Sequence, residues 1–133
     1  MNRKAETILL VDDDIDYLEQ TQLLLENAGW NVITAGGQKE AEECLERMTP
    51  DLAIVDLMME KMDGGFALSY HIRRKCPGTP VILVTAVASE TSIDFDAVTE
   101  EEKSWIKADV MLAKPVRFEQ LEREIKRLLA AKE

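Results

Sequence analysis

Near its amino terminus the chain reads Ile8-Leu9-Leu10-Val11-Asp12-Asp13-Asp14, a short apolar run that three carboxylates follow directly. Four later runs share its short length and its Gly, Pro or Asp borders: Val32-Ile33, Leu52-Ala53-Ile54-Val55, Val81-Ile82-Leu83-Val84 and Val110-Met111-Leu112. Short, continuous apolar runs rich in β-branched residues are typical of strands that are buried on both faces. The sequence therefore predicts five buried strands.

The segments between these runs carry apolar side chains at helical spacing. The expected apolar helix faces are formed by Leu18, Thr21, Leu25 and Ala28, by Ala41, Leu45 and Met48, by Leu68 and Ile72, and by Phe118, Leu121, Ile125, Leu128 and Leu129. Asp14 is expected to cap the first of these helices, and Gly29 is expected to end it. Strands that alternate with helices predict an α/β fold, in which right-handed crossovers cover both faces of a parallel sheet.

Composition limits the class of protein. The 133 residues carry a formal charge of −10, with 46% hydrophobic and 32% charged residues, and we expect one domain over residues 1–133 with a core of about 7–130. The negative charge argues against a nucleic-acid partner. Without a signal peptide or a long apolar run, we expect a cytoplasmic protein with no membrane partner. Cys44, Cys76 and a single histidine indicate neither a zinc site nor a disulfide framework.

Carboxylates at the strand ends suggest a metal site. In open parallel sheets, ligands bind outside the carboxyl ends of the strands, where the strand order reverses. Asp12 and Asp13 follow the first strand and Asp56 follows the third, so a 2-1-3-4-5 strand order would bring these side chains together. Crowded carboxylates repel one another, and a divalent cation relieves that repulsion. Because the ligands are all oxygens, the site favours Mg²⁺.

Two further groups stand at the same edge of the predicted sheet. Thr85 ends the fourth strand, and Lys114 follows the fifth. A hydroxyl, an ammonium and a metal ion around one carboxylate are complementary to a phosphoryl group. We therefore expect Asp56 to attack phosphorus and to form an aspartyl phosphate.

In this order, the acidic cluster, Asp56, Thr85 and Lys114-Pro115 resemble the motifs of bacterial two-component response-regulator receiver domains. The resemblance extends from Ile8 to about Leu129 and so covers almost the whole chain. It implies a flavodoxin-like, doubly wound sheet of five parallel strands in the order 2-1-3-4-5. It also implies that Asp56 is the phosphoacceptor and that the Lys114-Pro115 bond is cis.

The resemblance assigns further roles. Asp12 and Asp13 match the family's metal-binding pair, with the backbone carbonyl of Met58 as an additional ligand to Mg²⁺, while Thr85 and Lys114 match the conserved hydroxyl and lysine. The implied phosphoryl donor is the phosphohistidine of a sensor kinase or phosphotransfer protein, and the implied output is contact with a target protein. We expect a phosphoacceptor and not a turnover enzyme, as a monomer or a weak, phosphorylation-dependent dimer.

The sequence departs from the family in its switch region. Met111 stands where receivers usually carry an aromatic residue that moves together with Thr85. The stretch 86–108 makes the link to Lys114 roughly seven residues longer than is usual. Within it, a capping-box pattern at Thr99 predicts a short helix through Trp105 and Ile106.

Two apolar residues bear on the lifetime of the phosphorylated state. Met58 and Val87, two positions beyond Asp56 and Thr85, are apolar where some receivers with rapid turnover are polar. Apolar cover hinders the water that hydrolyses an acyl phosphate. We therefore expect phosphate to be lost slowly, over minutes or longer.

Two other functions remain open from the sequence. A degenerate receiver, used as an interaction module without phosphorylation, is consistent with Met111 and Glu60. A phosphatase of the haloacid-dehalogenase type is suggested by the Asp12-x-Asp14 spacing after a first strand, although a second, later acidic pair is missing. His71 is interpreted as a surface residue of the third helix.

Overall fold

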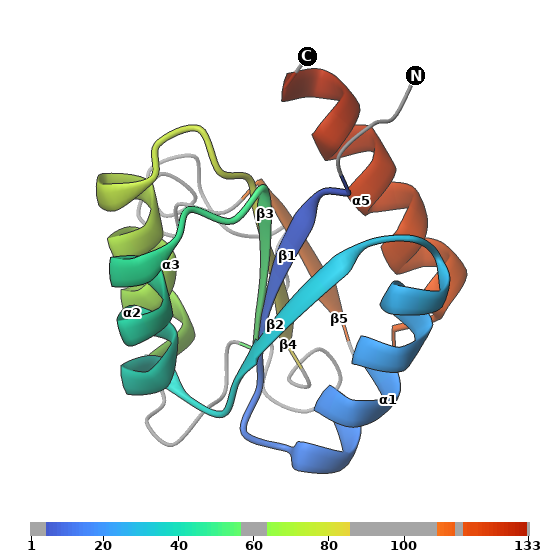
Figure 1. Cartoon of the computed structure of the whole chain (residues 1–133), viewed down its shortest axis with the longest axis horizontal. Coiled ribbons are helices and arrows are strands. Elements are labelled where there is room, and N and C mark those ends of the chain that lie inside the picture. The colour runs from blue at the N-terminus through green and yellow to red at the C-terminus, as the bar shows by residue number, and fades with distance from the viewer. Residues whose placement is uncertain (1–4, 57–63, 86–108, 114–115, 133) are drawn as a thin grey trace.

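The computed structural model describes residues 5–56, 64–85, 109–113 and 116–132. Within them, one parallel sheet is formed by β1 (Thr7–Val11), β2 (Asn31–Ala35), β3 (Leu52–Asp56), β4 (Val81–Thr85) and β5 (Val110–Ala113). The strand order is β2-β1-β3-β4-β5 (Figure 1). This order confirms the predicted doubly wound α/β fold.

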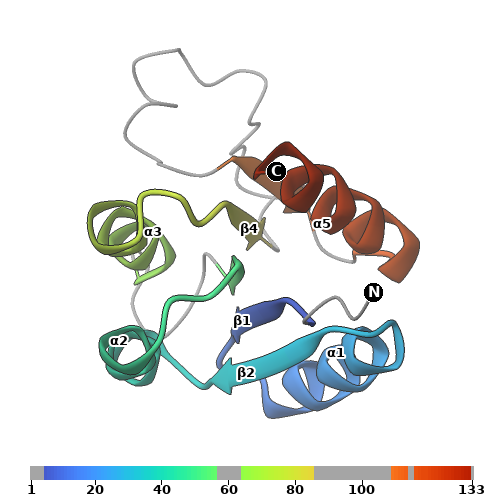
Figure 2. The same cartoon turned by 45° about the horizontal axis from the view of Figure 1, so that its top comes forward.

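Four described helices cover the sheet: α1 (Ile15–Asn27), α2 (Gln38–Arg47), α3 (Gly64–Lys75) and α5 (Phe118–Lys132). Helices α1 and α5 lie on one face, and α2 and α3 lie on the other (Figures 1 and 2). None of the four combines the length and the apolar character that crossing a membrane requires. The expected helix from Thr99 through Ile106 lies outside the described residues.

Each strand contributes side chains to two separate cores because successive residues point to opposite faces of the sheet. Leu9 and Val11 pack with residues of α2 and α3, such as Leu45 and Ile72. The alternate residues of the same strands, together with α1 and α5, form the second core: Ile8, Leu10, Leu18, Leu25, Leu52, Ile54, Ile82, Val84, Leu112, Leu121, Ile125, Leu128 and Leu129. A sheet buried on both faces explains why the strands are continuously apolar.

The ends of α1 follow the expected signals, with one correction. Asp14 is the N-cap, and its Oδ1 accepts a hydrogen bond from the backbone N–H of Tyr17 at 3.2 Å. After the helix, Gly29 adopts a φ of 107°, which glycine reaches without the steric cost of a Cβ. The expectation that Ala28 belongs to the buried face is wrong. It forms the C-cap and is exposed, because the chain leaves the helix at that residue.

Two aspartates form hydrogen bonds to neighbouring strands at the amino edge of the sheet. Asp51 precedes β3, and its Oδ2 accepts a hydrogen bond from the backbone N–H of Thr7 in β1 at 2.8 Å. Asp109 precedes β5, and its Oδ2 accepts from the backbone N–H of Val81 in β4, also at 2.8 Å. Arg73 of α3 forms an ion pair with the same Asp109 oxygen at 2.6 Å. Asp109 therefore joins two strands and a helix.

Candidate functional site

Three carboxylates meet at the opposite, carboxyl edge of the sheet. Asp12 and Asp13 directly follow β1, and Asp56 is the last residue of β3. The two strands are hydrogen-bonded neighbours, with Val11 in register with Val55. One carboxylate oxygen from each of Asp12, Asp13 and Asp56 lies within 4.8 Å of the others. The predicted convergence of these three side chains is therefore present in the structure.

Backbone contacts hold this cluster in place. The N–H of Asp12 donates to the carbonyl of Ala35 at 3.2 Å, which extends the contact between the β1 strand and β2 by one residue. The N–H of Asp14 donates to Oδ1 of Asp12 at 2.9 Å, so the start of α1 orients that carboxylate. The position of the Asp12 carboxylate is thus set by the turn from strand to helix.

The electrostatics of the cluster favour a cation. Asp12 is 1% exposed and Asp56 is 4% exposed, whereas Asp13 is open to solvent. Two unit charges 4.8 Å apart repel by about 3 kcal/mol at the effective dielectric constant of proteins. A divalent cation would replace this repulsion by attraction. Carboxylate oxygens alone, few in number and partly open to water, fit Mg²⁺.

Thr85 ends β4, and Lys114 follows the neighbouring strand β5 in the chain. Asp56 lies beside Val84 of β4, and Thr85 is the next residue and the last of that strand. Thr85 pairs with Ala113, the last residue of β5, which Lys114 follows in the chain. Four of the residues to which the sequence assigns a role in the site lie outside the described residues: Met58, Val87, Lys114 and Pro115.

Met111 lies in β5 on the sheet face that α2 and α3 cover. It is half-buried, pairs with Leu83 of β4 and packs against the core that contains Leu9 and Val55. The side chain of Met111 is therefore in contact with the core.

His71 lines a hollow at the surface of α3, on the side of α2. The residue is half-buried between α2 and α3, and its Nε2 is shielded from solvent. Tyr70 and Arg74 lie beside it, and the sequence reasoning assigned neither a role. In the sequence, the basic run Arg73-Arg74-Lys75 shortly after Tyr70 is the feature that indicates a basic surface here.

Both cysteines are free, as expected. Cys44 is half-buried and Cys76 is buried. Burial and the negative charge of Glu40 raise the pKa of the Cys44 thiol above its ordinary value, while Arg47 acts in the opposite direction. A thiol of this kind is a weak nucleophile at neutral pH.

Comparison with known sequences identifies the family. A family model described as the response regulator receiver domain matches residues 8–126. The alkaline phosphatase synthesis transcriptional regulatory protein PhoP of Bacillus subtilis is 32% identical over 133 residues, which are 100% of this chain and 51% of that protein. The chain spans about half or less of the length of the first curated relatives that it matches.

Solved structures agree with this match. A CheY-like receiver domain protein from Methanospirillum hungatei superposes with a TM-score of 0.80 and 27% identity, covering 97% of each chain. The response regulator TrrA from Thermotoga maritima, solved in complex with Mg²⁺ and BeF, gives a TM-score of 0.73 at 27% identity over 92% of this chain and 98% of that one. With the strand order, the acidic cluster and the family match in agreement, the chain belongs to the receiver domains of two-component response regulators.

Proposed function

We propose that this receiver domain, over residues 1–133, is phosphorylated on Asp56 and signals through contacts that depend on the phosphoryl group. The observation that carries the proposal is the convergence of Asp12, Asp13 and Asp56 within 4.8 Å. The backbone also places Thr85 at the end of the strand beside Asp56. This combination supports phosphoryl transfer over a purely structural role for the acidic residues.

Asp12, Asp13, Asp56 and the backbone carbonyl of Met58 would hold Mg²⁺. When bound, the ion neutralises the oxygens of the transferring phosphoryl group. A carboxylate oxygen of Asp56 attacks phosphorus and forms the new P–O bond. The bond from phosphorus to the donor breaks at the same centre, and its electron pair leaves with the donor, either the imidazole of a phosphohistidine or acetate. The hydrogen bond from the backbone N–H of Asp14 keeps the carboxylate of Asp12 in position beside Asp56.

Thr85 and Lys114 would bind the phosphoryl oxygens once the aspartyl phosphate has formed. The new charge at Asp56 would draw Thr85 inward and shift the balance between two arrangements of the face formed by the fourth helix of the family's fold, β5 and α5. Met111, which packs against the core beside β4, would repack in place of an aromatic switch. A partner protein would recognise this face in one of the two arrangements.

The proposed phosphoryl donor is a sensor histidine kinase or a phosphotransfer protein. PhoP of Bacillus subtilis is named as a transcriptional regulatory protein, and this chain spans 51% of its length. The charge of −10 argues that these residues themselves do not bind nucleic acid, and this stays a prediction. The monomeric or weakly dimeric state of the chain is likewise a prediction.

The direct test is incubation with acetyl phosphate and Mg²⁺, followed by intact mass measurement. We expect one added phosphate, absent from Asp56→Asn and from samples with EDTA. Asp51→Asn is a matched control, because Asp51 lies at the opposite edge of the sheet. It should be phosphorylated like the original chain.

An adduct that persists in Asp56→Asn would refute the assignment of the phosphoacceptor. No adduct under saturating acetyl phosphate would favour the interaction module without phosphorylation. After removal of acetyl phosphate, the adduct should decay over minutes or longer, and loss within seconds would contradict the proposed slow autodephosphorylation. Repeated release of phosphate from p-nitrophenyl phosphate would instead indicate a phosphatase.

A further inference from the structure

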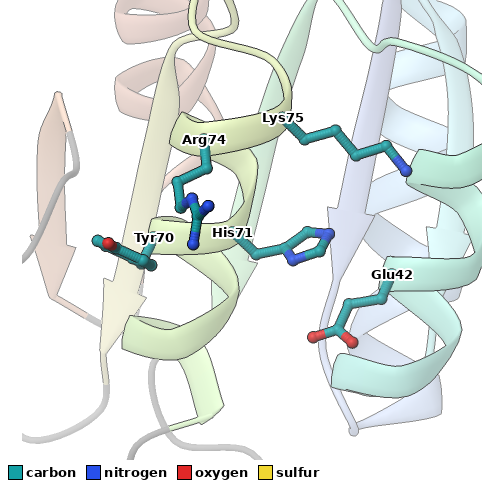
Figure 3. A pocket seen from close by; sticks show the side chains of 5 residues that line it. All are labelled: Glu42, Tyr70, His71, Arg74 and Lys75. Atoms are coloured by element: carbon teal, nitrogen blue, oxygen red, sulfur yellow. The ribbon is translucent and has the colours of Figure 1, made fainter.

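A second candidate site lies between α2 and α3. It is a hollow of about 500 Å³ lined by Glu42 of α2 and by Tyr70, His71, Arg74 and Lys75 of α3, and we call it the α2–α3 groove (Figure 3). Helix α3 returns from the carboxyl edge of the sheet to the amino edge, so its basic end lies away from the acidic cluster (Figure 1). The groove is therefore separate from the proposed phosphorylation site.

His71 contributes a half-buried imidazole to this groove. Its Nε2 is inaccessible to solvent and has no hydrogen-bond partner among the described residues. The imidazole extends across the groove toward α2, the helix that carries Glu42 (Figure 3). Oε2 of Glu42 accepts a hydrogen bond from Nε2 of Gln38 at 2.9 Å. Because solvent does not reach Nε2 of His71, a ligand in the groove would not contact it directly, and the imidazole serves as a reporter on the groove.

The groove also carries uncompensated positive charge. Within the part of the chain that the structure describes, no carboxylate pairs with Arg74 or Lys75, whereas the adjacent Arg73 is paired with Asp109. Basic residues in the last turn interact favourably with the helix dipole, which accounts for their presence but leaves their charges free to pair. In a chain of charge −10, two free cations against Glu42 make a locally basic site.

An aromatic ring extends the groove to the surface. Tyr70 is 49% exposed, and the guanidinium carbon of Arg74 lies 5.9 Å from the centre of its ring. Exposed Tyr and Arg side chains are the residue types that contribute most binding energy at protein interfaces. A small anion makes no favourable contact with the ring of Tyr70, whereas a peptide can cover the ring with an apolar side chain.

We propose that the α2–α3 groove binds an acidic segment of a partner protein. One carboxylate of that segment pairs with Arg74 and Lys75, and an apolar side chain covers Tyr70. This interaction goes beyond phosphoryl transfer and needs no phosphate on Asp56.

The test is a titration with a capped peptide that alternates glutamates with leucines, followed by NMR. Because the chain contains a single histidine, its imidazole signals belong to His71 without ambiguity. Peptide binding should shift these signals together with the backbone amides of α2 and α3. The same peptide with lysines in place of glutamates should leave them unchanged.

Charge variants locate the binding site. The double variant Arg74→Gln, Lys75→Gln should weaken the affinity roughly tenfold or more, because both cationic partners are lost. The matched control is Arg117→Gln, Arg123→Gln, which removes two cations that line a different hollow beside α5. This control should bind with unchanged affinity.

Three results would overturn the proposal. One is a titration in which the His71 signals stay fixed up to millimolar peptide. Another is an affinity that depends on Arg117 and Arg123 and not on Arg74 and Lys75. The third is an equal shift of the His71 signals by inorganic phosphate alone, which would define a small-anion site.

Discussion

Asp12 and Asp13 are adjacent in the chain but have different surroundings. Asp12 continues the line of β1 and is 1% exposed, whereas Asp13 faces solvent at the start of the turn. Water screens the charge of Asp13 but not that of Asp12. The same residue type therefore affects stability differently at the two positions.

We expect Asp12→Asn to raise the free energy of unfolding by about 1–3 kcal/mol in the absence of divalent cations, because it removes a buried charge beside Asp56. The asparagine oxygen can still accept the hydrogen bond from the N–H of Asp14. Asp13→Asn should give a smaller increase. Urea unfolding in EDTA measures both values, and a less stable Asp12→Asn variant would contradict the repulsion argument.

The raised pKa of Cys44 predicts slow alkylation. Only the thiolate reacts, so iodoacetamide at neutral pH should modify Cys44 in the folded chain more slowly than in urea. Glu40→Gln should accelerate the reaction and Arg47→Gln should slow it, because the two charges shift the pKa in opposite directions. Mass spectrometry of the modified chain measures the rates, with Cys44→Ser to assign the site.

The direction in which folding stability changes with pH is also testable at Cys44. Because the folded chain holds the thiol proton more tightly than the unfolded chain does, the stability contribution is complete at low pH and is lost as pH rises through the raised pKa. Cys44→Ser should flatten this alkaline decline. Equal acceleration of alkylation by Glu40→Gln and Arg47→Gln would indicate altered access and not altered charge.

At the scale of the elements, aspartates placed just before β3 and β5 join neighbouring strands. In both cases the aspartate carboxylate accepts a hydrogen bond from the first backbone N–H of the adjacent strand, where the hydrogen-bond ladder of the sheet begins. Hydrogen bonds to a charged acceptor are stronger than neutral ones. Asp109 adds a contact to α3 through Arg73, so the helix and both strands share one carboxylate.

We expect Asp109→Ala to lower the free energy of unfolding by about 1.5–3 kcal/mol, because the N–H of Val81 loses its charged acceptor. Arg73→Gln should cost only about 0.5–1 kcal/mol, since both side chains of the ion pair are 29% exposed. Urea unfolding of the single and double variants separates the two contributions. A larger loss in Arg73→Gln than in Asp109→Ala would show that the ion pair dominates.

For the whole molecule, the sheet separates two cores that do not share side chains. Ile72 of α3 is buried on one face, and Ile125 of α5 is buried on the other. Both are fully shielded from solvent, and both lie on helices that pack against the same strands. The two cores are thus joined through the backbone of the sheet.

Ile72→Val and Ile125→Val should each lower the free energy of unfolding by about 0.5–1.5 kcal/mol. Because the two side chains lie on opposite faces, the double variant should show the sum within about 0.5 kcal/mol. Urea unfolding followed by circular dichroism measures these values and should show one transition in each variant. Two separate transitions would mean that the cores unfold independently.

The fold and the acidic cluster were predictable from the sequence because each depends on local patterns. Continuous apolar runs identify strands buried on both faces, and a carboxylate that follows such a run lies at the carboxyl edge of the sheet, as Asp12, Asp13 and Asp56 do. The environment of His71 depends on how α2 packs beside α3, and helical spacing on one helix carries no information about that neighbour. The strand contacts of Asp51 and Asp109 likewise depend on register between distant segments.

The exposure of Asp13 has a kinetic consequence for the acidic cluster. A cation can reach the carboxylates from the solvent side without any opening of the sheet, and it can keep part of its water shell there. Exchange of an ion bound there as proposed would then be set by its own dehydration and not by unfolding. Mn²⁺ placed at this position would remain hydrated, and its paramagnetism would shorten the relaxation time of the surrounding water while the protein stays folded.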